Sequence, residues 1–196
     1  MSKVSRRSAL KALGSTAALL PALSPDGLLT FARIQAGNAP PTLKVLSTPD
    51  FRTLEALVEA IIPADERSPG AKDARVADYI DLLLSESDDE VALQWMGGLA
   101  ALNQEAALRF RRPFVGLDAA QVDSVLAAIS KNELDPGTPL EHFFVMTKQA
   151  TIRGYYSSEI GIHRELRYKG NQFLQEFVGC ATEDGKDCPH CGQKHL

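Results

Sequence analysis

The chain has 196 residues, of which 44% are hydrophobic and 23% charged, a composition typical of a globular protein. Its net charge is −4, and without residues 1–24, which hold four bases and no acid, 17 basic residues face 25 acidic ones, a net charge of −8. Such an acidic body excludes nucleic acid as an expected partner, because binding to phosphates needs a basic face. The length allows about one domain with a substantial core.

Residues 1–24 are typical of an N-terminal export signal. Residues 5–11, SRRSALK, resemble the twin-arginine signal Ser/Thr-Arg-Arg-x-Phe-Leu-Lys, with Ala9 in place of the phenylalanine. The apolar run over 12–23 is too short for a membrane span, which needs about 20 apolar residues. The resemblance implies that Arg6 and Arg7 are read by the twin-arginine translocase, which exports folded proteins to the periplasm.

The segment after the signal predicts a linker over residues 25–46. Small-x-small patterns at 22–24 and 37–39 offer cleavage sites, but Pro25 and Pro40 follow them directly and should hinder a peptidase. We therefore expect cleavage elsewhere, near Ala36, or retention of the signal as a weak anchor. The glycines and prolines of this segment favour a linker.

Helical signals repeat from residue 47 onward, and no alternating strand pattern competes with them. Thr48 is the expected cap of the first helix, with Pro49 and Asp50 in its first turn, and Pro63 ends that helix. A loop over 63–74 follows. The second helix carries one apolar stripe, made of Val76, Tyr79, Ile80, Leu83 and Leu84.

A third helix is expected over residues 90–110, where Gly97-Gly98 either weakens it or permits close packing. Capping boxes at 118–121 and 138–141 open two more helices. The predicted fold class is therefore mostly α. It is a single compact domain of about five helices over residues 47–179, followed by an irregular cysteine-rich tail over 180–196.

Familiar catalytic and cofactor-binding motifs do not occur in this sequence. It has no dinucleotide or phosphate-binding glycine loop, no His-Glu-x-x-His and no Gly-x-Ser-x-Gly. The acidic run at 88–90 predicts a solvated helix start. His142 is expected on the surface of a first helical turn and His163 in a polar loop. We therefore expect no catalytic or cofactor-binding residue in this chain.

The tail holds all three cysteines, in the pattern Cys180-x7-Cys188-x2-Cys191-x3-His195. Such spacing suits a zinc site, completed by His195 or by His190. In an exported protein, one disulfide with a spare thiol is the competing interpretation. A thiol oxidoreductase is disfavoured, because its reactive cysteine begins a helix on a βαβ frame that this sequence does not predict.

Two stretches resemble the gluconate 2-dehydrogenase subunit 3 family. They are residues 54–84, with IIPAD, PGA and VADYI, and residues 151–171, with GYYS. The resemblance implies the small subunit of a periplasmic, membrane-associated dehydrogenase of sugars, gluconate or polyols. In such complexes a large subunit of the glucose–methanol–choline type holds FAD, and a membrane cytochrome c subunit takes the electrons.

The resemblance implies no catalytic residue here, and a role as accessory subunit and export escort for a flavoprotein that often lacks its own signal. The loop over 63–72 and the aromatic segment 154–168 are candidates for the partner interface, with Tyr155 and Tyr156 as anchors. The alternative is an independent exported protein that binds a metal or thiols through its tail.

Overall fold

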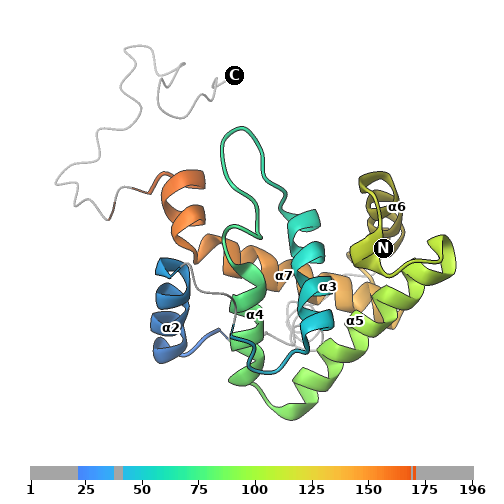
Figure 1. The fold of residues 1–196 in the computed structure, drawn as a ribbon, viewed down its shortest axis with the longest axis horizontal. Coiled ribbons are helices and arrows are strands. Elements are labelled where there is room, and N and C mark those ends of the chain that lie inside the picture. The colour runs from blue at the N-terminus through green and yellow to red at the C-terminus, as the bar shows by residue number, and fades with distance from the viewer. Residues whose placement is uncertain (1–21, 38–41, 169, 171–196) are drawn as a thin grey trace, which may run out of the picture.

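The computed structural model describes residues 22–37, 42–168 and 170, and these form helices and loops without a strand (Figure 1). The mostly α fold class is therefore confirmed for this part of the chain. Its helices are α2 (Pro25–Ala36), α3 (Thr48–Ile61), α4 (Val76–Ser85), α5 (Asp89–Phe110), the 3₁₀ helix η1 (Phe114–Gly116), α6 (Ala119–Ile129), α7 (Pro139–Tyr156) and the π-helix η2 (Ile160–Glu165).

Helix α4 lies at the centre of the body, where α2, α3 and α7 pack against it (Figure 1). Every residue from Val76 to Leu84 is buried, including the polar positions between the five apolar residues of the expected stripe. A helix buried on all sides needs neighbours all round. Helix α5 packs against α3 and α7, and α6 in turn packs against α5 and α7.

Two buried carboxylates on α4 have hydrogen-bond partners. Asp81 accepts hydrogen bonds from the backbone N–H groups of residues 44, 45 and 46, at 2.6, 3.1 and 2.8 Å. Asp78 accepts two from the guanidinium of Arg75, at 2.8 and 2.7 Å. Buried charges are tolerated when they are paired in this way. Asp81 thereby holds the chain before α3 against the central helix.

The segment expected to be a linker begins with helix α2, which corrects that expectation for residues 25–36. Ser24 caps α2 by accepting a hydrogen bond from the Gly27 N–H at 3.0 Å, and Pro25 and Asp26 occupy its first turn. These are the start signals that identify α3 in the sequence. The helix is held on the body because Phe31 is only 1% exposed.

The expected helix starts agree closely with the structure. The cap of α3 is Ser47 instead of Thr48, and α5 begins at Asp89, one residue earlier than expected. Both expected capping boxes are present, at the starts of α6 and α7. Side-chain caps therefore define the starts of α3, α6 and α7, whereas α5 begins with acidic residues and no side-chain cap bond.

Helices α5 and α7 approach closely at Gly98. A Cβ atom there would overlap the ring of Phe143 on α7, whereas a Cβ at the adjacent Gly97 would meet nothing within 4 Å. Phe143 packs edge-on against Trp95, with ring centroids 5.7 Å apart. Of the two expected roles of the glycine pair, close packing therefore applies to Gly98.

Candidate partner-binding surface

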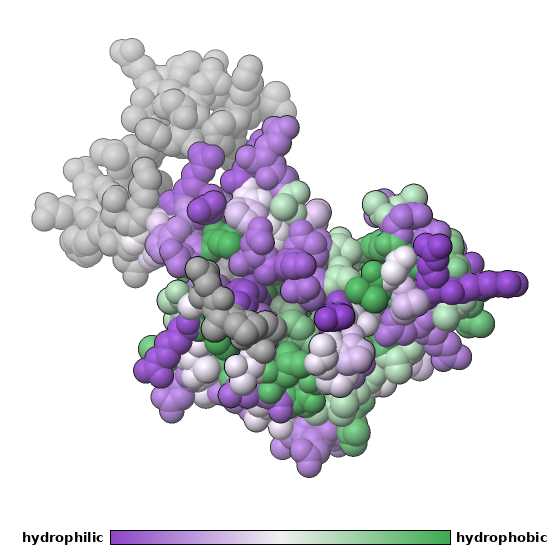
Figure 2. Space-filling model, in the orientation of Figure 1, coloured by the Kyte–Doolittle hydropathy of each residue, from purple (hydrophilic) through white to green (hydrophobic). Residues whose placement is uncertain are grey.

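The loop between α3 and α4 rises from the body between the ends of these helices (Figure 1). We call residues 62–75 the α3–α4 loop. Residues 63–67 at its tip are exposed, whereas Ser68, Gly70 and Ala71 are buried. Hydrophilic side chains gather in this region of the surface (Figure 2). The loop therefore combines an exposed tip with a buried second half.

Glu59, in the last turn of α3, joins the two ends of the α3–α4 loop. One carboxylate oxygen accepts a hydrogen bond from the Ala64 N–H at 3.2 Å, and the other accepts one from the Lys72 N–H at 2.8 Å. The backbone N–H of Ala71 also donates to the Ile62 carbonyl, at 2.9 Å. These bonds satisfy backbone groups that the loop would otherwise leave to water.

Asp65 forms a tight turn at the exposed tip. Its Oδ1 accepts hydrogen bonds from the N–H groups of Arg67 and Ser68, both at 2.8 Å, and its own N–H donates to the Ser68 carbonyl at 3.0 Å. The pKa of Asp65 is lowered, chiefly by the bond from the Arg67 N–H and then by that from Ser68. The carboxylate is thus ionised and shapes the turn at neutral pH.

Tyr155, near the end of α7, holds the buried half of the loop. Its hydroxyl donates to the Pro69 carbonyl at 2.8 Å and lies 2.7 Å from the Ser68 hydroxyl. A phenol has one proton, so Ser68 is the donor in the second bond. Burial is the main cause of the raised pKa of Tyr155. The phenol is therefore neutral and able to donate at physiological pH.

The two tyrosines expected at the partner interface lie in different environments. Tyr155 is 2% exposed and belongs to the core, so its surface is not available to a partner. Tyr156 is 40% exposed, and its ring packs edge-on against that of Tyr155 with centroids 5.4 Å apart. Ile152, one turn earlier on α7, is 42% exposed. Tyr156 and Ile152 are therefore the accessible pair.

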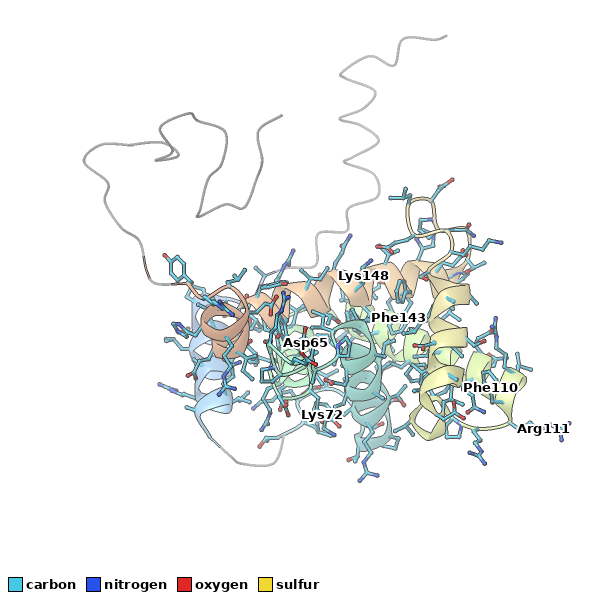
Figure 3. The ribbon with its side chains drawn as sticks, turned by 90° about the horizontal axis from the view of Figure 1, so that it is seen from above. Asp65, Lys72, Phe110, Arg111, Phe143 and Lys148 are labelled. Carbon is cyan, nitrogen blue, oxygen red and sulfur yellow. The ribbon has the colours of Figure 1, made fainter. Side chains whose placement is uncertain are left out.

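A lysine of the α3–α4 loop and a lysine of α7 each form an ion pair. The ammonium of Lys72 pairs with Glu55 on α3 at 3.2 Å, and Lys148 on α7 binds Glu133 through both carboxylate oxygens, at 2.7 and 2.8 Å. Figure 3 shows Lys72 with Asp65 from the same loop, and Lys148 further along α7. Both ammonium groups are therefore neutralised by carboxylates of the same body.

A polar cavity of about 240 Å³ lies where α2, the end of the α3–α4 loop and η2 meet. His163 is expected from the sequence in a polar loop, but it belongs to η2, a π-helix, and lines this cavity. Its mixed charges favour no single ligand class. The lining residues are Gln35, Asp73, Glu159, Ile160, His163 and Arg164.

A second, mainly apolar cavity of about 440 Å³ lies between α5 and α7 beside Gly97 and Gly98. His142, expected on the surface of the first turn of α7, is exposed and lines the edge of this groove. Glycines and an alanine of α5 create the space, and Gln94 and His142 are the polar side chains that line it.

The remaining expected site residues lie outside the described residues. They are Arg6 and Arg7 of the leader and Cys180, Cys188, Cys191, His190 and His195 of the tail. Among residues 22–37, 42–168 and 170, no group of three or more metal-ligating side chains occurs. No helix in this described part is long and apolar enough to cross a membrane.

Comparison with known proteins gives one match. A family model described as gluconate 2-dehydrogenase subunit 3 matches residues 48–173, which extend from the start of α3 beyond η2. Searches of curated proteins and of solved structures found no match. The matched residues include the α3–α4 loop and Tyr155, which holds it, and they exclude α2. The match covers more than half of the sequence, so this chain belongs to the gluconate 2-dehydrogenase subunit 3 family.

Proposed function

We propose that this chain is the non-catalytic small subunit and export escort of a periplasmic FAD-dependent dehydrogenase that oxidises a sugar, gluconate or a polyol. The observation that carries this proposal is the family match over residues 48–173, because its description names a dehydrogenase subunit. FAD and the catalytic residues then belong to a large subunit of the glucose–methanol–choline type. A membrane cytochrome c subunit takes the electrons.

The escort role rests on the arginine pair at positions 6 and 7. If the dehydrogenase subunit has no signal of its own, it crosses the membrane only while bound to this chain. Export of folded proteins allows such a complex to assemble, with FAD loaded, before it is carried to the periplasm. One leader then serves two proteins.

The surface that we assign to the large subunit combines the tip of the α3–α4 loop with Ile152 and Tyr156. The hydrogen bonds of Glu59, Asp65 and Tyr155 hold the loop in one conformation before a partner binds. Binding then costs little loop entropy, which is the usual benefit of a preorganised surface. Exposed aromatic side chains such as Tyr156 commonly provide the energetic centre of an interface.

Replacement of Arg6 and Arg7 together by lysine tests the escort role. Lysine keeps the charge, but its ammonium cannot reproduce the planar, five-donor guanidinium. We expect this chain and the flavin dehydrogenase to remain in the cytoplasm, with dehydrogenase activity lost from the periplasmic fraction and retained in lysed cells. Lys3→Arg, a charge-conserving change in the same leader, is the control and should leave export unchanged.

Two outcomes would contradict the proposal. If the lysine variant retains this chain in the cytoplasm while the dehydrogenase reaches the periplasm in normal amount, the chain is not the escort. If purification of the wild-type chain under mild conditions recovers no flavoprotein, it is not a stable subunit of such a complex. Mass spectrometry of the copurified proteins and the flavin absorbance of the sample provide both measurements.

A further inference from the structure

Helix α2 is attached to the body at the point where the described chain begins. Leu23 is 4% exposed. The backbone N–H and the hydroxyl of Ser24 each donate to the carboxylate of Glu86, at 2.8 Å in both cases. Glu86 is the C-cap residue of α4. Gly27 lies so close to the same carboxylate that a Cβ atom would overlap it. The contacts of these three residues therefore fix the first turn of α2 on the body.

The rest of α2 packs on the central helix. Phe31 is 1% exposed, and its ring meets that of Tyr79 on α4 edge-on, with centroids 5.2 Å apart. Near the end of α2, the Gln35 side chain donates to the Ala74 carbonyl at 3.2 Å. Beyond α2, Asp81 accepts the three backbone hydrogen bonds from residues 44–46. The body thus holds both ends of the segment that the sequence suggests is a linker.

This packing bears on the two small-x-small patterns of the leader region. Cleavage after Ser24 would remove Leu23 and Ser24 from their contacts with the body. Cleavage after Ala36 would cut the chain at the last residue of α2, and cleavage after Ala39 would meet Pro40, which hinders a peptidase. Either cut would separate from the chain the helix that carries the buried Phe31. Proteases act on backbone that is exposed and free of hydrogen bonds, so burial and hydrogen bonding decide which bonds are accessible. Helix α2 offers no such bond.

We infer that α2 is a permanent part of the mature protein, so that any removal of the leader occurs at or before the bond between Ala22 and Leu23. The inference rests on the proposed export as a folded protein, because the body and α2 are then already packed together when a periplasmic peptidase meets the chain. The family match begins at residue 48, so α2 lies outside the matched residues.

The N-terminus of the exported protein tests the inference directly. The full chain is purified from the periplasm and its first residue is determined by N-terminal sequencing and intact mass. The expected first residue is Leu23 or an earlier one. A first residue anywhere from 24 to 46 would overturn the inference and leave the subunit assignment unaffected, since the matched residues would remain.

Trypsin tests the attachment of α2 without any export, on the full chain purified from the cytoplasm. Arg33 lies within α2, and cleavage after it requires the helix to leave the body. In the wild type this bond should be as resistant as the bond after Lys148, which lies in the middle of α7. In Phe31→Ala it should be cut on the order of tenfold faster or more, because the cleavage rate follows the population of the open form.

Leu29→Ala is the matched control, because Leu29 lies on the same helix and is 59% exposed. It should be cut at the wild-type rate. Ser24→Ala removes the cap of α2 and one hydrogen bond to Glu86 but leaves the core unchanged, so it should give an intermediate cleavage rate. This variant provides the test if Phe31→Ala does not fold. If wild-type α2 is cut after Arg33 as fast as the Phe31→Ala variant, or far faster than α7 is cut after Lys148, α2 is not attached in solution and the inference is wrong.

Discussion

The hydroxyl oxygens of Tyr155 and Ser68 lie 2.7 Å apart, although 87 positions separate the two residues in the chain. Through this bond and the one from Tyr155 to the Pro69 carbonyl, the end of α7 determines the shape of the α3–α4 loop. Tyr155→Phe should therefore lower the free energy of unfolding by about 1–3 kcal/mol, because Ser68 and Pro69 lose a buried partner. Urea unfolding measures the change.

The neighbouring tyrosine supplies the control for this prediction. Tyr156→Phe should change the free energy of unfolding by no more than about 0.5 kcal/mol, as is usual at exposed positions. Equal effects of the two substitutions would mean that the hydroxyl of Tyr155 does not hold the loop.

The glycine pair of α5 gives a second test of packing. Gly98→Ala should destabilise the protein by about 1–3 kcal/mol, because the added methyl group overlaps the Phe143 ring and forces α5 and α7 apart. Gly97→Ala should instead stabilise it by roughly 0.5–1 kcal/mol, since alanine favours helix and its Cβ meets nothing within 4 Å. Thermal unfolding of both variants measures the difference, and equal melting temperatures would contradict the close approach.

Acid should weaken the start of α7 through Glu141. The pKa of this carboxyl is lowered, first by the hydrogen bond from the Gly137 N–H and then by that from the Asn132 side chain, with Thr138 contributing further. A lowered pKa in the folded state means stability that is present above the unfolded pKa of about 4.3 and is lost as the pH falls through the folded value.

Glu141→Gln checks this pH dependence. The wild type should be more stable than the variant at pH 7, and the difference should shrink as the pH falls below about 4.3, because the wild-type carboxylate becomes protonated. Urea unfolding at several pH values from 7 downward gives the comparison. A difference that stays constant throughout would show that the ionised carboxylate is not what stabilises this helix start.

The surface proposed for the large subunit predicts one binding defect without loss of stability. Tyr156→Ala should reduce copurification of the flavin dehydrogenase at least several-fold, since truncation of a central aromatic residue commonly costs 2 kcal/mol or more. Leu134→Ala is the control, because Leu134 is fully exposed in the connection between α6 and α7. If both variants retain the partner equally, the interface lies elsewhere on the body.

The sequence predicts those parts of the fold that local chemistry determines. Caps and capping boxes lie within four residues of the groups they bind, so the starts of α3, α6 and α7 are predicted to within a residue or two. The start of α5, which has no side-chain cap bond, is predicted equally well from the acidic residues of its first turn. The apolar stripe of α4 is confirmed, because each of its five residues is buried.

Long-range contacts explain what the sequence analysis does not predict. The burial of Asp81 depends on backbone groups 35 to 37 positions away, and the assignment of Tyr155 to the core depends on Ser68. Residues 24–26 carry the sequence signals of a helix start, but the nearby glycines and prolines predict a linker. Only the packing of α2 against Tyr79 shows that it belongs to the body.

The burial of Leu23 limits the distance between the proposed twin-arginine leader and the folded protein. Arg7 is 16 residues from Leu23, which at roughly 3.5 Å per residue allows a tether of at most about 56 Å. Were the body to begin at Ser47, 40 residues would allow about 140 Å. Docking of α2 therefore more than halves the reach of the leader, and the proposed translocase receptor that holds the arginines must work close to the surface of its folded cargo.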